Sequence, residues 1–212
     1  MAAETSHLAH HYGGMAAQVH AARLGMWLFL GTEALLFGVL FTGYSFYRFL
    51  FASSFALASE HLDIAYGTIN TFVLITSSFS VAMALHYTKH GARRRALLAL
   101  GVTLTLAAAF LVIKGFEWAN DFREGIFPGP YYTGALKDVQ GAALFYNFYF
   151  LMCGLHGIHV IVGIGVLSWM TYRVASGYYH PGYSTPLELG AMYWHLVDII
   201  WIFLYPFLYL VT

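Results

Sequence analysis

Long apolar runs separated by short polar segments make up most of this chain. A helix needs about 20 mostly apolar residues to cross the hydrocarbon of a bilayer, and five segments are long enough. The predicted spans run from Gly25 to Tyr47, Ile64 to Tyr87, Ala96 to Phe116, Ala142 to Thr171 and Leu189 to Leu210. The pattern therefore predicts an all-α membrane protein: a polar tail (residues 1–22), then a single bundle of five transmembrane helices (residues 23–212).

Composition supports the membrane class. Of the 212 residues 59% are hydrophobic and only 9% are charged, whereas soluble domains carry about 25% charged residues. The ten acidic and ten basic residues balance, so the charge gives no reason to expect a nucleic-acid partner.

The distribution of Lys and Arg predicts the orientation, because cytoplasmic loops carry the excess of these residues. The N-terminal side holds six of them: Arg23, Lys89, Arg93, Arg94, Arg95 and Arg173. The opposite side holds four, diluted by acidic residues: Arg48, Lys114, Arg123 and Lys137. We expect the N-terminus in the cytoplasm and, after five crossings, the C-terminus outside.

Small residues indicate how the helices pack. Gly31, Ala34, Gly38 and Thr42 form one stripe on the first span. Helices in lipid gain more from close backbone approach and interhelical hydrogen bonds than from apolar burial. We therefore predict that this stripe packs tightly against another helix of the chain.

A few ionisable side chains lie within the spans, and such residues are functional candidates by default. Glu33 points about 145° away from the small-residue stripe at 100° per residue, so we expect its carboxyl to face either a second interface or a lipid-lined surface. His156 and His159 share a face of the fourth span, and His195 and Asp198 share a face of the fifth. Glu117 follows the third span, with Lys114 one turn before it.

Three interpretations compete for these groups. His, Glu and Asp side chains are plausible metal ligands, but the spacing HxxH is not the HExxH of a zinc hydrolase. Haem ligation by one histidine from each of the last two spans is a second possibility. The third is hydrogen bonding between helices, which satisfies polar groups in lipid, and the chemistry favours it. A small transporter lacks support, because no broken helices or repeated halves are evident.

Three motifs carry a resemblance to a known family. WLFLGTEALLFG in the first span, CGLHGIHVIVG in the fourth and YWHLVDIIWIFLYPFLYL in the fifth resemble subunit III of the haem–copper respiratory oxidases. They occur in that family's order, and the resemblance covers Arg23 to Thr212. The family has a seven-helix form and a five-helix form that lacks the first two helices, and this chain resembles the latter.

The resemblance implies an accessory subunit without a redox centre and without catalytic or metal-binding residues of its own. Haem and copper are then expected on subunits I and II, and this chain would pack against subunit I, near subunit II and other respiratory complexes. Its expected roles are to stabilise subunit I and support proton uptake in an oxidase that pumps protons and reduces O₂. The family also holds phospholipid in a cleft. The five-helix form cannot build that cleft alone, so another subunit would have to complete it.

The resemblance also implies roles for particular residues and a location. Glu33 matches the membrane glutamate of the family, for which a proton-related task is expected, and a glutamate here is similar to cytochrome c oxidases more than to quinol oxidases. Five further residues match recurrent polar positions and are expected to form an interhelical polar network: Glu117, His156, His159, His195 and Asp198. The expected location is the bacterial cytoplasmic (inner) membrane. Two alternatives stay open: subunit III of a quinol oxidase, and a self-contained b-type cytochrome or metalloenzyme using His156, His159 and His195.

Overall fold

The computed structural model describes residues 8, 9 and 12–210, and in this part of the chain all regular structure is helical. The six α-helices and one short 3₁₀ turn are α1 (Met15–Leu50), α2 (Ala52–Ser59), α3 (Ile64–Lys89), α4 (Arg93–Arg123), η2 (Gly129–Tyr131), α5 (Ala142–Ala175) and α6 (Thr185–Tyr209). All but α2 and η2 are long and apolar enough to cross a membrane. The prediction of a five-span helical bundle is therefore confirmed.

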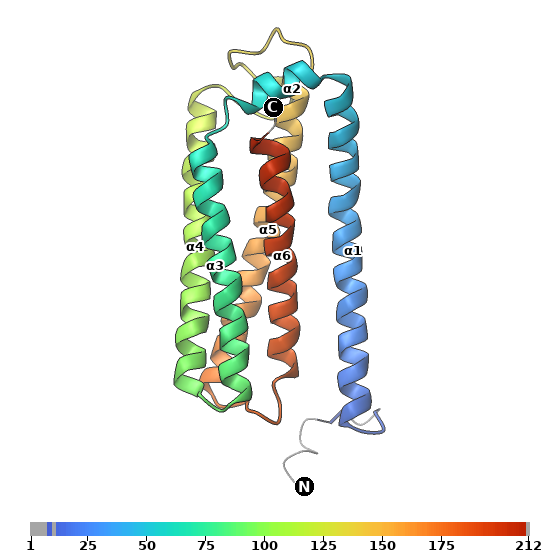
Figure 1. Cartoon of the computed structure of the whole chain (residues 1–212), viewed down its shortest axis with the longest axis vertical. Helices are drawn as coiled ribbons and strands as arrows, with labels where there is room; N and C mark the ends of the chain where they lie inside the picture. Colours follow the sequence, from blue (N-terminus) through green and yellow to red (C-terminus); the bar gives the residue numbers. More distant parts are fainter. Residues whose placement is uncertain (1–7, 10–11, 211–212) are drawn as a thin grey trace.

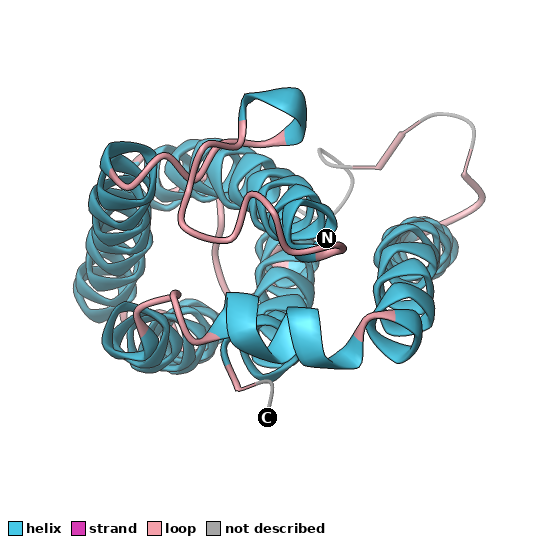
Figure 2. Cartoon of the chain, turned by 90° about the horizontal axis from the view of Figure 1, so that it is seen from above, coloured by secondary structure: helices cyan, strands magenta, loops and turns pink. Residues whose placement is uncertain are grey.

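The long helices form a four-helix bundle and one outlying helix. α3, α4, α5 and α6 surround a common interior, while α1 stands to one side and contacts α5 and α6 more sparsely (Figures 1 and 2). In the most apolar stretch of α1 only 11% of the residues are buried, against 56% for α6. Most of α1 is thus available to lipid or to another protein.

Two helix boundaries differ from the prediction by more than four residues. α1 begins at Met15, ten residues before the predicted Gly25, and α4 extends to Arg123 instead of Phe116. A helix of 36 residues is about 54 Å long at 1.5 Å per residue, which exceeds the roughly 30 Å of hydrocarbon. Hydropathy identifies only the part of a helix that lies within the hydrocarbon. The helix can continue into polar sequence beyond it, and hydropathy does not detect those turns.

The short helix α2 was not predicted. It crosses the end of the molecule between α1 and the bundle (Figure 1), and we call this end the α2 end. Phe55 and Ala58 are fully buried. The Tyr146 hydroxyl donates to the Ala58 carbonyl at 3.2 Å, and the Phe55 ring packs on Tyr44 of α1 with centroids 5.4 Å apart. α2 therefore adds a bridge between α1 and α5 at the end where Tyr44 of α1 also packs on Phe148 of α5.

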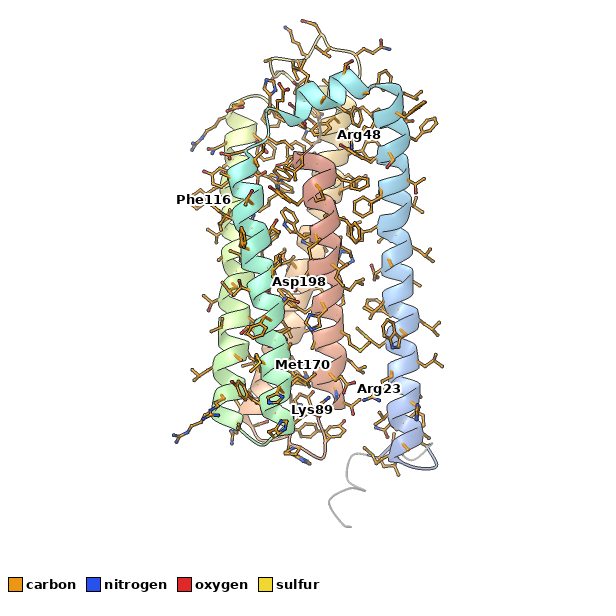
Figure 3. The ribbon with its side chains drawn as sticks, in the orientation of Figure 1. Arg23, Arg48, Lys89, Phe116, Met170 and Asp198 are labelled. Carbon is orange, nitrogen blue, oxygen red and sulfur yellow. The ribbon has the colours of Figure 1, made fainter. Side chains whose placement is uncertain are left out.

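The opposite end, which we call the basic end, holds the α3–α4 turn and the start of α6. Glu188 of α6 accepts from Arg23 of α1 at 2.9 Å and from Lys89 of α3 at 3.1 Å. Figure 3 shows Arg23 and Lys89 at this end. These exposed ion pairs contribute about 0–1 kcal/mol each, so they orient the helix ends more than they stabilise the bundle.

The prediction of tight packing at the small-residue stripe of α1 is wrong. A Cβ atom added at Gly31 or Gly38 would meet nothing within 4 Å. Close approach occurs elsewhere: a Cβ on Gly163 of α5 would lie 2.7 Å from the Trp194 ring of α6. A stripe of small residues shows where a helix could approach, but the shape of the partner helix decides whether it does.

Candidate functional site

The most polar part of the interior is a cluster at the α2 end of the bundle. Lys114 lies on α4, and its ammonium donates to Glu117 Oε1 at 3.0 Å, to the Tyr149 hydroxyl of α5 at 3.1 Å and to the Tyr209 hydroxyl of α6. Tyr149 also lies 3.0 Å from Asp121 Oδ2. Side chains from α4, α5 and α6 thus meet on one ammonium, whose three protons are all used.

Proton donors are too few in this cluster for its acceptors. The Tyr149 hydroxyl is within 3.0 Å of carboxyl oxygens on both Glu117 and Asp121, but its single proton can serve one of them at a time. Glu117 Oε2 is buried and has no hydrogen-bond partner among the described residues. The site therefore combines two carboxyl groups with one ammonium and an unfilled acceptor, which suits it to hold water or a further proton.

A second polar contact joins α1 to the bundle. The His159 Nε2 atom lies 2.9 Å from Glu33 Oε2, with 13% and 18% of the two side chains exposed. His159 Nδ1 contacts the Leu155 carbonyl at 2.8 Å, and Phe37 packs edge-on to the imidazole. Of the two surroundings expected for Glu33, a second interface or lipid, the structure shows the interface, because α5 approaches the side of α1 that lies away from the small residues.

Hydroxyl groups of α3 line the face of α6. Trp194 Nε1 donates to Ser77 Oγ and Trp201 Nε1 donates to Thr71 Oγ1, both at 3.0 Å. Ser78 Oγ lies 2.6 Å from His195 Nδ1. Thr68 Oγ1 lies 2.7 Å from the Tyr205 hydroxyl, so hydroxyl side chains of α3 contact α6 at four described positions.

Asp198 and His156 lie in the bundle interior without such contacts. Asp198 is 3% exposed and neighbours Ser78, yet neither of its carboxyl oxygens has a hydrogen-bond partner among the described residues. His156 is fully buried and both ring nitrogens are unpartnered there. Figure 3 shows Asp198 about midway along the bundle.

The candidate site residues therefore fall into separate contacts. Glu117 belongs to the α2-end cluster, His159 pairs with Glu33, and His195 pairs with Ser78. Within the described residues no three His, Cys, Asp or Glu side chains converge as a metal site would require. The His156 ring packs against Phe110 and Trp201, with centroids 5.6 and 5.3 Å away, so aromatic rings occupy positions that a haem would need. This geometry does not favour the cytochrome or metalloenzyme alternative.

Sequence reasoning missed Asp121, Tyr209 and Asn70. Asp121 lies beyond the predicted end of the third span at Phe116, although Lys114, Glu117 and Asp121 recur at i, i+3 and i+7 on one helix face. That spacing was the available signal. Asn70 is fully buried in α3, and a lone amide in an apolar run gives no comparable pattern.

An apolar groove separates α1 from α6. Its cavity of about 530 Å³ is bounded on α1 by Trp27, Leu30, Gly31 and Ala34, and on α6 by Met192, His195, Leu196 and Ile199. A second cavity of about 270 Å³ lies nearer the basic end, between α1, α5 and α6, and includes Met26 and Tyr193. The groove exists because the small residues of α1 face it without filling it.

Comparison with known proteins identifies one family. The family described as cytochrome c oxidase subunit III matches residues 1–212. Cytochrome c oxidase subunit 3 of Bacillus subtilis (strain 168) is 30% identical over 187 residues, which cover 88% of this chain and 84% of the relative. Quinol oxidase subunit 3 of the same strain is 29% identical over 187 residues, covering 88% and 85%. The probable cytochrome c oxidase subunit 3 of Rickettsia bellii (strain RML369-C) is 30% identical over 217 residues, covering 90% and 69%.

Proposed function

Because the chain belongs to the cytochrome c oxidase subunit III family, in which it is an accessory, non-catalytic subunit of a terminal oxidase, we propose that it packs against subunit I and supports proton uptake there. The basic end then faces the cytoplasm and the α2 end faces outward across the bacterial cytoplasmic membrane. The sparse burial of α1 supports docking through this helix, since an apolar helix with little intramolecular contact is suited to a partner in the membrane.

The observation that carries the proton-related role is the contact of Glu33 with His159. Both groups can release a proton, both lie between α1 and α5, where α1 contacts the bundle sparsely, and both are partly exposed. A carboxyl–imidazole pair can hold and pass on a proton. The pair therefore offers a site at the surface of this subunit from which protons can reach a partner.

The test separates this role from a structural one. Glu33→Gln keeps a hydrogen bond to His159 but cannot release a proton, whereas Glu33→Ala removes both. Slower proton uptake in both variants of the purified oxidase, followed with a pH-indicator dye during a single turnover, is the expected result. Normal uptake in Glu33→Gln with a defect only in Glu33→Ala would assign the pair to packing. Thr32→Val, next to Glu33 on α1, is the matched control, because the Thr32 hydroxyl bonds only within its helix, to Phe29.

The electron donor of the complex is proposed to be cytochrome c, with quinol as the alternative. The relatives include both classes at nearly equal identity, and Glu33 is the residue that favours cytochrome c. Oxygen consumption by the purified complex with reduced cytochrome c, compared with a short-chain quinol, decides between them.

The five polar residues Glu117, His156, His159, His195 and Asp198 are proposed to hold the helices in register. The contacts of Glu117, His159 and His195 with other helices support this role, and His156 and Asp198 lie buried between the helices. Alanine variants should then lose this subunit from the complex on detergent extraction, in proportion to the contacts that each residue makes. Full retention in all five variants would contradict it.

A phospholipid acyl chain is proposed to occupy the groove between α1 and α6. The walls are apolar and the cavity of about 530 Å³ is of the size of small-molecule sites. An added Cβ at Gly31 meets nothing within 4 Å, so Gly31→Leu directs its side chain into the groove and should reduce the phospholipid retained per complex in native mass spectrometry. Gly165→Leu on α5, where an added Cβ is equally free, is the control and should leave the lipid content unchanged. Equal lipid content in both variants would refute the proposal.

A further inference from the structure

We propose that the interior of the α3–α6 bundle is a hydrated polar half-channel, through which protons exchange between water at the α2 end and Asp198. The half-channel has three sections, each made by side chains of two or more helices. The outer section is Lys114, Glu117, Asp121, Tyr149 and Tyr209; the middle section is Asn70 and His156; the inner section is Asp198, Ser77 and Thr103.

The outer section reaches the surface. Asp121 lies in the last turn of α4 and retains 6% exposure. From there the Tyr149 hydroxyl connects Asp121 with Glu117 and Lys114 over distances of 2.9 to 3.1 Å. Each step joins a proton donor to an acceptor, so the outer section is continuous without water.

The middle section adjoins the outer one across a shared indole. Lys114 Nζ lies 5.6 Å from the Trp201 ring centroid, and the His156 ring centroid lies 5.3 Å from the same indole. Neither nitrogen of His156 has a hydrogen-bond partner among the residues that the structure describes. His156 is thus a fully buried imidazole one layer of side chains inward from the outer section. Both of its ring nitrogens are available for hydrogen bonds.

Asn70 occupies the same level on α3. Thr103 of α4 donates to the Ser77 carbonyl at 3.5 Å and Ser80 donates to the Ala99 carbonyl at 2.8 Å, and this antiparallel register puts Asn70 opposite Phe110. The Phe110 ring also packs against the His156 ring, so Asn70 and His156 lie at the same level of the bundle. Asn70 is fully buried, and both amide atoms are unpartnered within the described residues.

The inner section continues one turn further along α6. Asp198 precedes Trp201 by three residues and follows Trp194 by four, so the three side chains share a face. Ser77 accepts from Trp194, and Thr103 lies beside Ser77. Towards α1, Ser78 adjoins Asp198 and contacts His195, which lines the groove.

These unpartnered groups require a partner that the helices do not supply. A buried amide, imidazole or carboxyl without a hydrogen bond is strongly disfavoured, and most buried polar atoms in proteins have a protein or water partner. The groups of Asn70, His156 and Asp198 follow one another along the bundle interior, and a buried water needs two to four polar partners. Ordered water between these groups would give each buried polar atom a hydrogen-bond partner, and the groups would give the water the partners it needs. Such water completes the path from Asp121.

The half-channel ends inside the membrane. Beyond Ser77 towards the basic end, most buried residues are apolar: Val81, Ala84, Ala96, Leu100, Leu167 and Leu187. The buried hydroxyls of Ser80 and Thr88 donate to the backbone carbonyls of Ala99 and Ala84. Close packing of such side chains leaves no sites for water. Protons can therefore exchange at Asp198 from the α2 end without crossing the membrane, which a proton-pumping complex requires.

Exchange of a thiol proton for deuterium tests the path in the intact oxidase complex. The S–H stretching band of cysteine shifts on deuteration and lies where proteins absorb little else. Ser77→Cys puts the probe in the inner section, and Val81→Cys puts it one helical turn beyond the closed end. Both are made with Cys153→Ala, which removes the chain's single cysteine without adding a hydroxyl beside Lys114, and are read as infrared differences from that parent in D₂O.

The expected result is exchange at least several-fold faster in Ser77→Cys than in Val81→Cys. Adding His156→Leu, which removes the middle section, should slow the Ser77→Cys probe several-fold, whereas Leu167→Met should not. Equal rates at the two probes would overturn the half-channel, and no effect of His156→Leu would remove His156 from it.

A second measurement decides even where these variants fail to assemble. A high-resolution cryo-EM map of the unaltered complex should show ordered solvent within hydrogen-bond distance of Asn70, His156 and Asp198. Direct contacts of all three with protein groups, and no solvent density, would refute the proposal. Neither measurement depends on the electron donor or on the role of Glu33; only the side of the membrane that the channel faces rests on the proposed orientation.

Discussion

His159 Nε2 lies 2.9 Å from Glu33 Oε2, and this contact joins α1 to α5 at a point where few other side chains do. The pair is 126 residues apart in the chain. It gives the outlying helix a defined rotation, with Glu33 towards the bundle and the small residues towards the groove.

The first prediction concerns the strength of this contact. In the complex, Glu33→Ala should weaken the packing of α1 by about 0.6 kcal/mol and by no more than ~1.7 kcal/mol, the range measured for interhelical hydrogen bonds in membranes. A double-mutant cycle with His159→Ala, based on thermal unfolding of the complex, measures the coupling. Additive effects of the two substitutions would show that the contact contributes nothing.

The second prediction concerns the α2-end cluster. Lys114→Met should destabilise the subunit by about 3–5 kcal/mol, because two buried carboxyl groups lose their ammonium. Lys114→Met combined with Glu117→Gln and Asp121→Asn should recover much of the loss, since the uncompensated charge is gone. Retention of the subunit during detergent titration reports both effects. A triple variant as unstable as Lys114→Met alone would show that packing, and not charge, sets the loss.

The third prediction compares two glycines of the same helix. Gly163→Ala should destabilise by about 1–3 kcal/mol, the usual cost of overpacking, because its Cβ would lie 2.7 Å from Trp194. At Gly157 an added Cβ meets nothing within 4 Å, so Gly157→Ala should be neutral or stabilise by up to about 1 kcal/mol through helix propensity. Melting temperatures of the two variant complexes test the difference. The opposite order would mean that the α5–α6 contact is looser than described.

The fourth prediction concerns redox centres. The separated subunit should show no Soret absorption and no stoichiometric metal, because the His156 ring is enclosed by Phe110 and Trp201 while His159 and His195 are each engaged by another side chain. An optical spectrum and elemental analysis of the isolated chain are sufficient. A tightly bound haem would revive the cytochrome alternative.

The number and approximate position of the spans follow from the sequence alone. Hydropathy is a local property, since each residue's transfer into lipid depends little on distant residues. The same reasoning selected the ionisable residues within the spans, because their cost in lipid is also local. The family motifs could also be recognised from the sequence alone, because each of them is a contiguous stretch of residues.

Which polar residues meet was decided by the tertiary structure. The direction in which Glu33 points could be calculated from helix geometry, but not that α5 lies in that direction with His159. Likewise, Gly31 and Gly163 have the same local chemistry, yet one faces open space and the other a tryptophan ring. Helical periodicity defines the face that each residue occupies, while the positions and shapes of neighbouring helices depend on contacts far apart in the chain. For that reason the polar groups of the bundle interior, from Asp121 to Asp198, could be identified only from the tertiary structure.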